Sequence, residues 1–162
     1  MIEVEIDAAA WSAGLPDASG IAARAAAAAL QAVQRADADL VILLTDDDAI
    51  ARLNAEFRGK SGPTNVLSFP APSSAAPHLG DVALAWGVCA SEAAEQDKAL
   101  AHHLMHLVAH GVLHLVGYDH ETDAEAESME ALERQLMQGL GAPDPYAGES
   151  RQPGPATGGH AR

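Results

Sequence analysis

Hydrophobic and polar positions along this chain follow two different periods, which predict strands in some segments and helices in others. Residues 2–6 alternate apolar and acidic side chains, the pattern of a half-buried strand. Residues 39–45 form a nearly continuous apolar run of strand length, which is typical of a strand covered on both faces. Two further strands are predicted over residues 64–69, which Pro70 stops, and over residues 81–86.

Helices are predicted for most of the chain between and after these strands. Residues 17–36 are rich in alanine, the residue with the highest helix propensity, and Asp17 or Ser19 is available as the N-cap. Residues 71–78 contain Ala, Pro and Ser and are expected to form a flexible connection. Further helical segments are residues 46–57, about 90–116 with an expected break near Asp97 and Lys98, and 122–140.

This order of elements predicts an α+β (mixed α/β) fold, with about four strands in one mixed sheet and four to five helices packed against it. A length of 162 residues suits a single small domain. We place that domain at residues 1–146. Residues 147–162 are rich in Gly, Pro and Ala and are predicted to form a disordered tail, in which His160 is incidental.

Composition narrows the class of protein. No apolar run approaches the roughly 20 residues of a membrane span, and the N-terminus lacks the basic start of a signal peptide. Cys89 is the single cysteine, so no internal disulfide is expected, and these features together favour the cytoplasm. The net charge of -14 argues against nonspecific nucleic-acid binding, which depends on Lys and Arg contacts to phosphates.

One local cluster of basic residues stands against this acidic background. Arg52, Arg58 and Lys60 lie within nine residues of one another and are three of only nine basic residues. From composition alone, we interpret them as solvated charges near a helix end. The acidic run at residues 46–48 is likewise interpreted as helix capping and not as a metal site.

The chemistry of the chain is concentrated at His110, His114 and His120. Two histidines four residues apart lie one turn apart on a helix face. The third follows Gly117, which can end the helix and turn the chain back. This spacing can bring three neutral imidazoles onto one zinc ion and leave a fourth position open, as in catalytic zinc sites. The sequence therefore predicts a metal-dependent enzyme with its metal site on a central helix.

Other residues around this cluster have further expected roles. His106 continues the same helical stripe and is expected to pack beside the ligands or support them through a hydrogen bond. His102 and His103 are expected to be partly exposed. Zinc peptidases with the His-Glu-x-x-His motif carry a glutamate base where this chain has Gly111, so that base is missing. Asp119 has two open interpretations, as a residue that orients a ligand imidazole or as a turn residue.

Residues 110–120 resemble the signature of the YbeY family at every fixed position, and the resemblance covers most of residues 40–146. YbeY proteins are bacterial rRNA maturation factors described as single-strand-specific endoribonucleases. Asn65 stands where many members have Asp. Three upstream blocks are also similar to those of the family: Leu53-Asn54 with Phe57-Arg58-Gly59-Lys60, Thr64-Asn65-Val66-Leu67-Ser68-Phe69-Pro70, and Leu79-Gly80-Asp81-Val82.

This resemblance implies one zinc ion held by His110, His114 and His120, with Arg58 facing the metal cleft. Arg58 then becomes a phosphate-binding residue, since guanidinium matches phosphate bidentately, and Arg58 and His114 are the expected catalytic residues. The implied substrate is single-stranded rRNA, in small-subunit rRNA 3′ end processing, ribosome biogenesis and ribosome quality control. The ribosome or its associated proteins are implied as partners, with no membrane or DNA.

Two rival hypotheses remain open from the sequence. One is a zinc hydrolase that acts on peptides or small molecules. The other is a non-catalytic ribosome-assembly factor in which zinc stabilises the fold. The general base and the attacking nucleophile, water or a ribose 2′-hydroxyl, also stay unassigned.

Overall fold

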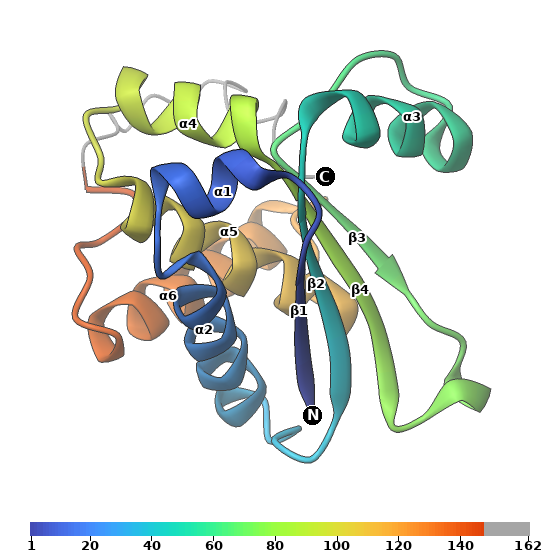
Figure 1. Ribbon diagram of the computed structural model, residues 1–162. Coiled ribbons are helices and arrows are strands. Elements are labelled where there is room, and N and C mark those ends of the chain that lie inside the picture. Colours follow the sequence, from blue (N-terminus) through green and yellow to red (C-terminus); the bar gives the residue numbers. More distant parts are fainter. Residues whose placement is uncertain (148–162) are drawn as a thin grey trace.

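A computed structural model of the chain describes residues 1–147. It contains one four-stranded sheet in the order β1-β2-β4-β3, surrounded by helices (Figure 1). The predicted α+β class, single small domain and four strands are confirmed. The predicted tail, residues 147–162, lies outside the described residues except for Ala147. The strands are β1 (Ile2–Ile6), β2 (Asp39–Thr45), β3 (Val66–Pro70) and β4 (His78–Ala85).

Six helices occur in the described part of the chain, one more than the upper end of the predicted range. The break expected near Asp97 is confirmed, and Asp97 itself has a positive φ of 56°. The helices are α1 (Ala9–Gly14), α2 (Ala18–Ala32), α3 (Asp47–Arg58), α4 (Trp86–Glu95), α5 (Leu100–Leu115) and α6 (Asp123–Gly139). None of these helices is both long enough and apolar enough to cross a bilayer.

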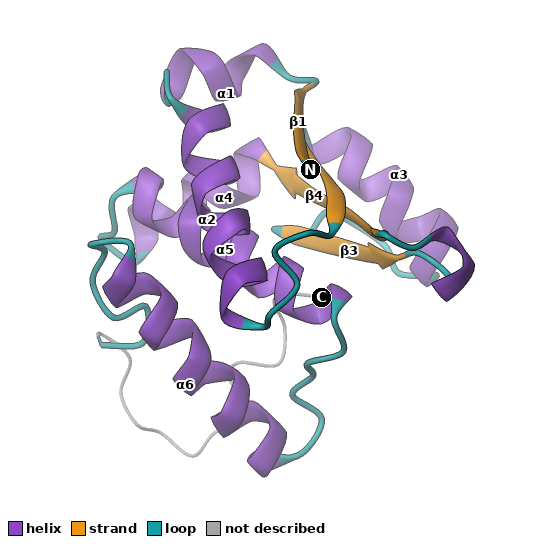
Figure 2. Ribbon diagram, turned by 90° about the horizontal axis from the view of Figure 1, so that it is seen from below, coloured by secondary structure: helices purple, strands orange, loops and turns teal. Residues whose placement is uncertain are grey.

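The sheet is mixed. β1, β2 and β4 are parallel, and β3 pairs with β4 in the antiparallel direction at one edge. Figure 2 shows α3 on one side of the sheet and α2 and α5 on the other. The parallel arrangement needs a crossover between successive strands, which α2 supplies between β1 and β2.

The two faces of the sheet are covered to different extents. Along β2, Leu40, Ile42 and Leu44 are buried in the main core beneath α2 and α5. Val41 and Leu43 alternate with them onto the other face, where they are only half-buried. The expectation that this strand is covered on both faces was therefore wrong for the second face, because α3 covers only part of it.

Several predicted boundaries need correction. The alanine-rich helix ends at Ala32 rather than 36, since the chain turns at Gln34, which has a φ of 61°. The short helix α1 was not predicted, and it is stabilised by the buried Trp11, whose Nε1 donates to the Thr45 carbonyl at 2.9 Å. The predicted flexible connection is shorter, because it contains a 3₁₀ turn at Ser73–Ala75 and β4 already begins at His78.

Capping interactions define where α3 and α6 begin or end, and both helices carry residues of the candidate site. Asp46 caps α3 by accepting a hydrogen bond from the Ala49 backbone at 2.8 Å, which confirms the capping interpretation. Gly59 ends the same helix in the left-handed conformation, with a φ of 66°. At the start of α6, Thr122 and Glu125 form a reciprocal capping box. These caps fix the ends of α3, which lies across the sheet from α5, and of α6, which packs against α5.

Candidate metal centre and adjoining cleft

Three histidines meet at the C-terminal end of α5. His110 and His114 lie on its last two turns and His120 follows the helix, and one ring nitrogen of each lies within 4.8 Å of the others. The Nε2 atoms of His110 and His114 are 3.1 Å apart. Ligands at 2.0–2.1 Å from a tetrahedral zinc ion are separated by about 3.3 Å. The donor set and the His110–His114 spacing therefore fit zinc.

The turn after α5 brings His120 back to the helix. Gly117 has a φ of 104°, a conformation that favours glycine. Its N–H donates to the His114 carbonyl, and the Tyr118 N–H donates to the Leu113 carbonyl, both at 3.0 Å. These bonds close the helix end and reverse the chain, as the sequence predicted. As a result, the rings of His114 and His120 lie 5.4 Å apart between centroids.

A buried carboxylate orients His110 from another helix. Oε2 of Glu133 in α6 lies 2.5 Å from Nδ1 of His110, and the Glu133 side chain is fully buried. A carboxylate accepts at this position, so Nδ1 carries the proton and Nε2 presents its lone pair toward His114. The sequence analysis missed Glu133. The 23-residue separation from His110, on a different helix, leaves no spacing signal that could have found it.

Glu133 also holds two other polar groups. Its Oε1 is 3.0 Å from Nε2 of His106 and accepts a hydrogen bond from the Tyr146 hydroxyl. Burial alone would raise the pKa of the Glu133 carboxyl, but the hydrogen bonds from His106 and His110 outweigh it and hold the pKa below its ordinary range. For His106 the charged form is the protonated one, so burial lowers the pKa of this side chain. Glu133 is therefore a buried carboxylate with its oxygens fully engaged.

A second group of three potential ligands, His106, His110 and Glu133, shares His110 with the first. A metal ion between two ligands at about 2 Å each needs those atoms about 3 Å or more apart. The Nδ1–Oε2 separation of 2.5 Å between His110 and Glu133 is that of a hydrogen bond. The structure therefore places His106 beside Glu133, in a supporting position, and leaves the histidine triad as the candidate metal site.

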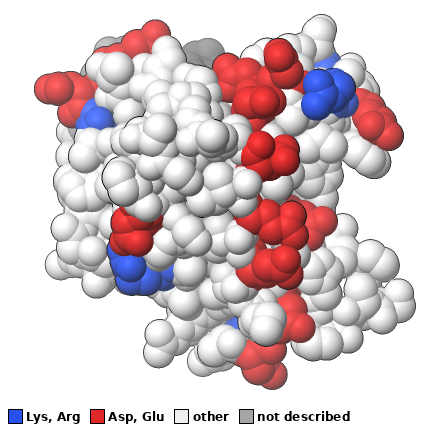
Figure 3. All heavy atoms as spheres, in the orientation of Figure 1, with Lys and Arg blue, Asp and Glu red and all other residues white. Residues whose placement is uncertain are grey.

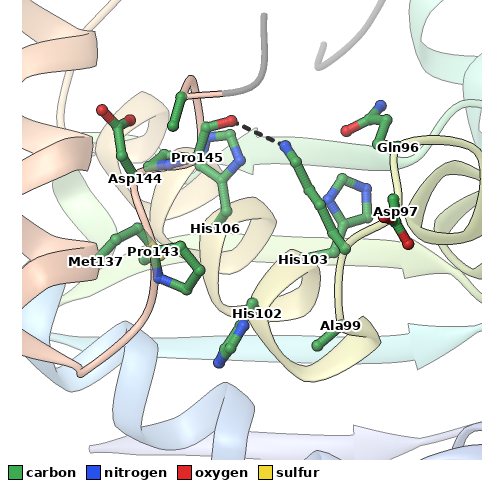
Figure 4. Close-up of a pocket in the computed structure, with 12 residues that line it drawn as sticks. Gln96, Asp97, Ala99, His102, His103, His106, Met137, Pro143, Asp144 and Pro145 are labelled. Atoms are coloured by element: carbon green, nitrogen blue, oxygen red, sulfur yellow. Dashed lines mark hydrogen bonds between the residues drawn. The ribbon is translucent and has the colours of Figure 1, made fainter.

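The N-terminal half of α5 carries two more histidines. The expectation of a partly exposed His103 was wrong: this side chain is 4% exposed, because its Nε2 bonds Oε1 of Glu92 at 2.9 Å. His102 is half-buried. Figure 4 shows this end of the helix facing a cavity of about 260 Å³ that the C-terminal segment helps to close. There Lys98 donates to the Pro145 carbonyl at 2.8 Å.

Gly111 faces the sheet and not the metal centre. A Cβ atom at this position would lie 2.7 Å from Cγ1 of Val82 and 3.2 Å from Oγ of Ser68. The Ser68 hydroxyl donates to the Gly111 carbonyl at 3.0 Å, so helix and strand are in direct contact. The residue is therefore a packing glycine. A glutamate here would point into the sheet, so this site has no place for the peptidase base.

Asp119 takes part in the turn before the third histidine. Its Oδ1 accepts a hydrogen bond from the His120 backbone N–H at 2.7 Å. This contact supports the interpretation of Asp119 as a turn residue. The same side chain lines the cavity beside His114.

That cavity joins the metal centre to the end of α3. It encloses about 230 Å³, and Arg58 and His114 line it together with Ser68, Pro70, Asp119 and Glu121. Nη2 of Arg58 donates to the Ser68 carbonyl at 2.9 Å, which holds the guanidinium over β3. The sequence-predicted residues Arg58, His110, His114 and His120 are thus gathered at one end of α5, with Arg58 and His114 sharing a cavity. Arg52 and Lys60 are exposed and do not line it.

Comparisons with known proteins identify the family of the chain. A family model described as Endoribonuclease YbeY matches residues 11–141. Proteins of that name are similar to this chain over most of its length. One from Rhodopseudomonas palustris (strain HaA2) is 51% identical over 161 residues, covering 92% of this chain and 83% of the relative. One from Maricaulis maris (strain MCS10) is 57% identical over 116 residues, covering 72% of each.

The fold also matches a solved structure. The solution structure of TM1509 from Thermotoga maritima superposes with a TM-score of 0.54 and 24% sequence identity. The match covers 95% of this chain and 99% of the other. The arrangement of helices around the four-stranded sheet is therefore one that an experimentally determined protein shares.

Proposed function

The chain belongs to the endoribonuclease YbeY family, as its motifs predicted, and on that premise we propose that it is a zinc-dependent endoribonuclease specific for single-stranded RNA. Its proposed role is small-subunit rRNA 3′ end processing in the cytoplasm, within ribosome biogenesis and ribosome quality control. Its proposed partners are rRNA and the ribosome or ribosome-associated proteins. The observation that carries the proposal is the shared cavity of Arg58 and His114, beside the triad of histidines.

His110, His114 and His120 are the residues that would hold the zinc ion. When bound, zinc supplies Lewis acidity toward a phosphoryl oxygen and a lowered pKa for a coordinated water. His110 is held in the tautomer that presents Nε2 to the ion, because Glu133 accepts at Nδ1. His114 and His120 are half-buried, and His114 lines the cavity that Arg58 shares, so the proposed centre adjoins that cavity.

Arg58 binds and polarises the scissile phosphate in this proposal. A guanidinium can donate two parallel hydrogen bonds to phosphate oxygens and stabilise the charge that develops on them. Among residues 1–147, one Nη atom of Arg58 donates to the Ser68 carbonyl at 2.9 Å, and the other donors of the guanidinium remain available to a ligand. Asp119 and Glu121 are the carboxylates that line the same cavity, and they are the candidates for the general base.

The acidic composition is compatible with this role. A net charge of -14 suppresses nonspecific binding along the surface, and Arg58 provides a local phosphate contact within the cleft. Single-stranded RNA can reach such a cleft because its unpaired bases and backbone are accessible. A peptidase is disfavoured, because residue 111 faces Val82 in the sheet.

His114→Ala tests the proposal. The variant should lose both bound zinc, measured by elemental analysis, and cleavage of a labelled single-stranded rRNA fragment, followed on gels. His102→Ala is the matched control, since His102 is half-buried on the same helix and lies outside the triad. It should keep zinc and activity. Full cleavage by metal-free His114→Ala protein would contradict the proposed mechanism.

A further inference from the structure

A groove on the open face of the sheet adjoins the metal-side cavity. It encloses about 880 Å³ between the half-covered strands and α3, with Val41 and Leu43 among its lining residues. Arg58, Ser68 and Pro70 line both the groove and the cavity beside His114. A polymer with one monomer bound at Arg58 would therefore have the adjacent monomer at the mouth of the groove.

Phe57 stands at this mouth. Its side chain is 61% exposed. The other large hydrophobic side chains exposed in residues 1–147, Met1 and Ile6, are not aromatic. The Phe57 ring packs edge-to-face on Phe69, with centroids 5.6 Å apart and planes at 70°. The contact fixes the ring while its outer surface remains accessible. A fixed, accessible aromatic ring beside an arginine is the arrangement that single-stranded nucleic acid uses for base stacking.

The charges that line the groove differ between its two ends, and they favour different parts of a nucleotide. Arg58 lies at the end shared with the metal-side cavity, whereas Glu5 and Asp81 line the groove over the sheet. Figure 3 shows a column of acidic side chains down the face of the molecule seen in that view. Carboxylates repel a phosphate, so the part of a nucleotide that enters the groove is the uncharged base. The phosphate stays with Arg58.

Asp81 also lies where it can affect which base enters. It is the cross-strand partner of Phe69, on the same face of the sheet as the ring that supports Phe57. A carboxylate accepts hydrogen bonds, and the exocyclic amino groups of cytosine and adenine donate them. Uracil presents a carbonyl oxygen at the corresponding position, which the carboxylate disfavours.

We propose that Phe57 and Asp81 form a nucleobase subsite next to the scissile phosphate, which stacks the neighbouring base and favours cytosine or adenine over uracil. This inference rests on the proposed function, because it places that base by the phosphate at Arg58. It adds a specificity-determining site on the sheet face, outside the metal centre. A basic protein segment is the competing occupant of an acidic, apolar groove, and the test below separates the two.

The experiment uses zinc-loaded full-length protein and short labelled single-stranded RNAs. Phe57→Leu removes the aromatic ring and keeps an apolar side chain, and Phe57→Trp retains a stacking surface. We expect Phe57→Leu to raise KM for RNA roughly 5- to 100-fold, the range of base–aromatic stacking, with kcat and zinc content little changed. Phe57→Trp should restore KM. An abasic nucleotide beside the cleavage site should raise KM for wild type and have no added effect on Phe57→Leu.

The outcomes are distinguishable. Unchanged KM for Phe57→Leu in an active enzyme overturns the subsite and leaves the proposed function standing. Lost binding to ribosomal particles with unchanged KM for RNA also overturns it, in favour of protein docking. Equal KM for oligonucleotides with uracil or cytosine beside the cleavage site overturns the part assigned to Asp81. Wild-type protein that neither binds nor cleaves RNA contradicts both proposals.

Discussion

Nδ1 of His110 lies 2.5 Å from Oε2 of Glu133, so a buried carboxylate on α6 fixes the proton position of a candidate metal ligand on α5. Neither side chain is accessible enough for water to replace the partner, since Glu133 is fully buried and His110 is 7% exposed. The contact joins the last helix of the domain to the metal centre. If the histidines hold zinc as proposed, we expect the metal affinity to depend on how α6 and the segment carrying Tyr146 pack.

Glu133→Gln should weaken zinc binding about 10- to 100-fold, the usual effect of removing a partner of a ligating histidine. The change keeps the side-chain volume and removes the charge that fixes Nδ1–H on His110. Competition with a chromophoric chelator measures the affinity. Glu130→Gln is the matched control, because Glu130 lies on the same helix in a half-buried ion pair with Arg134. Equal zinc affinity for Glu133→Gln and wild type would remove the orienting role.

The metal-free protein should lose stability as the pH falls below about 6.5, the unfolded pKa of histidine. Burial lowers the pKa of His106 in the folded state. The unfolded chain therefore binds more protons below that pH, and the free energy of unfolding decreases. Glu133, whose pKa is also lowered, adds a second loss below about 4.3. Its contribution is fully present above that pH.

Urea unfolding between pH 7.5 and pH 4 measures this dependence. His106→Gln should flatten the curve between pH 6.5 and pH 5, because Gln does not titrate and can still donate to Glu133. His102→Gln on the same helix should leave the curve as in wild type. A wild-type curve that is flat across this range would contradict the assigned effect of burial on His106.

Gly111→Ala should destabilise the fold by about 1–3 kcal/mol, the range for overpacking a dense core. The new Cβ would lie 2.7 Å from Cγ1 of Val82, so α5 must move away from the sheet. Gly139→Ala in α6 is the control, since within residues 1–147 its Cβ would meet no atom within 4 Å apart from its chain neighbours and the local helix backbone, and alanine favours helix. It should be neutral or stabilising. Thermal melting of both variants without metal compares them, and an unchanged melting temperature for Gly111→Ala would contradict close packing here.

Arg58→Ala should keep bound zinc and reduce RNA cleavage roughly 10²- to 10³-fold, as expected for loss of a group that stabilises developing charge. Arg58→Lys should restore only part of the rate, because an ammonium does not bind phosphate bidentately. Arg52→Ala is the control, since Arg52 lies on the same helix and outside the cavity. Normal cleavage by Arg58→Ala would show that the phosphate is bound elsewhere.

The meeting of the three histidines could be predicted from the sequence because local geometry determines it. His110 and His114 share a helix face, and Gly117 turns the chain so that His120 joins them. Glu133 could not be predicted, because its position depends on how α6 packs against α5. The same reason explains the error at His103, since its burial depends on a contact with Glu92 in another helix.

Strand positions were predicted better than the environment of each strand. The apolar run of β2 gave the correct bounds, Asp39–Thr45, from hydrophobicity alone. The open face over Val41 and Leu43 depends on how far α3 extends across the sheet, which the run does not encode. Helix α1 was missed because six residues have little intrinsic helical stability, and the buried Trp11 stabilises it.

If His110, His114 and His120 hold the zinc ion as proposed, RNA cleavage depends on that ion. Cleavage of single-stranded RNA should be followed with one purified sample before chelation, after complete removal of metal, and after one equivalent of zinc is restored. We expect cleavage activity to be lost on metal removal and recovered with zinc, while the unfolded fraction of the protein stays low throughout. Undiminished cleavage by folded, metal-free protein would contradict it.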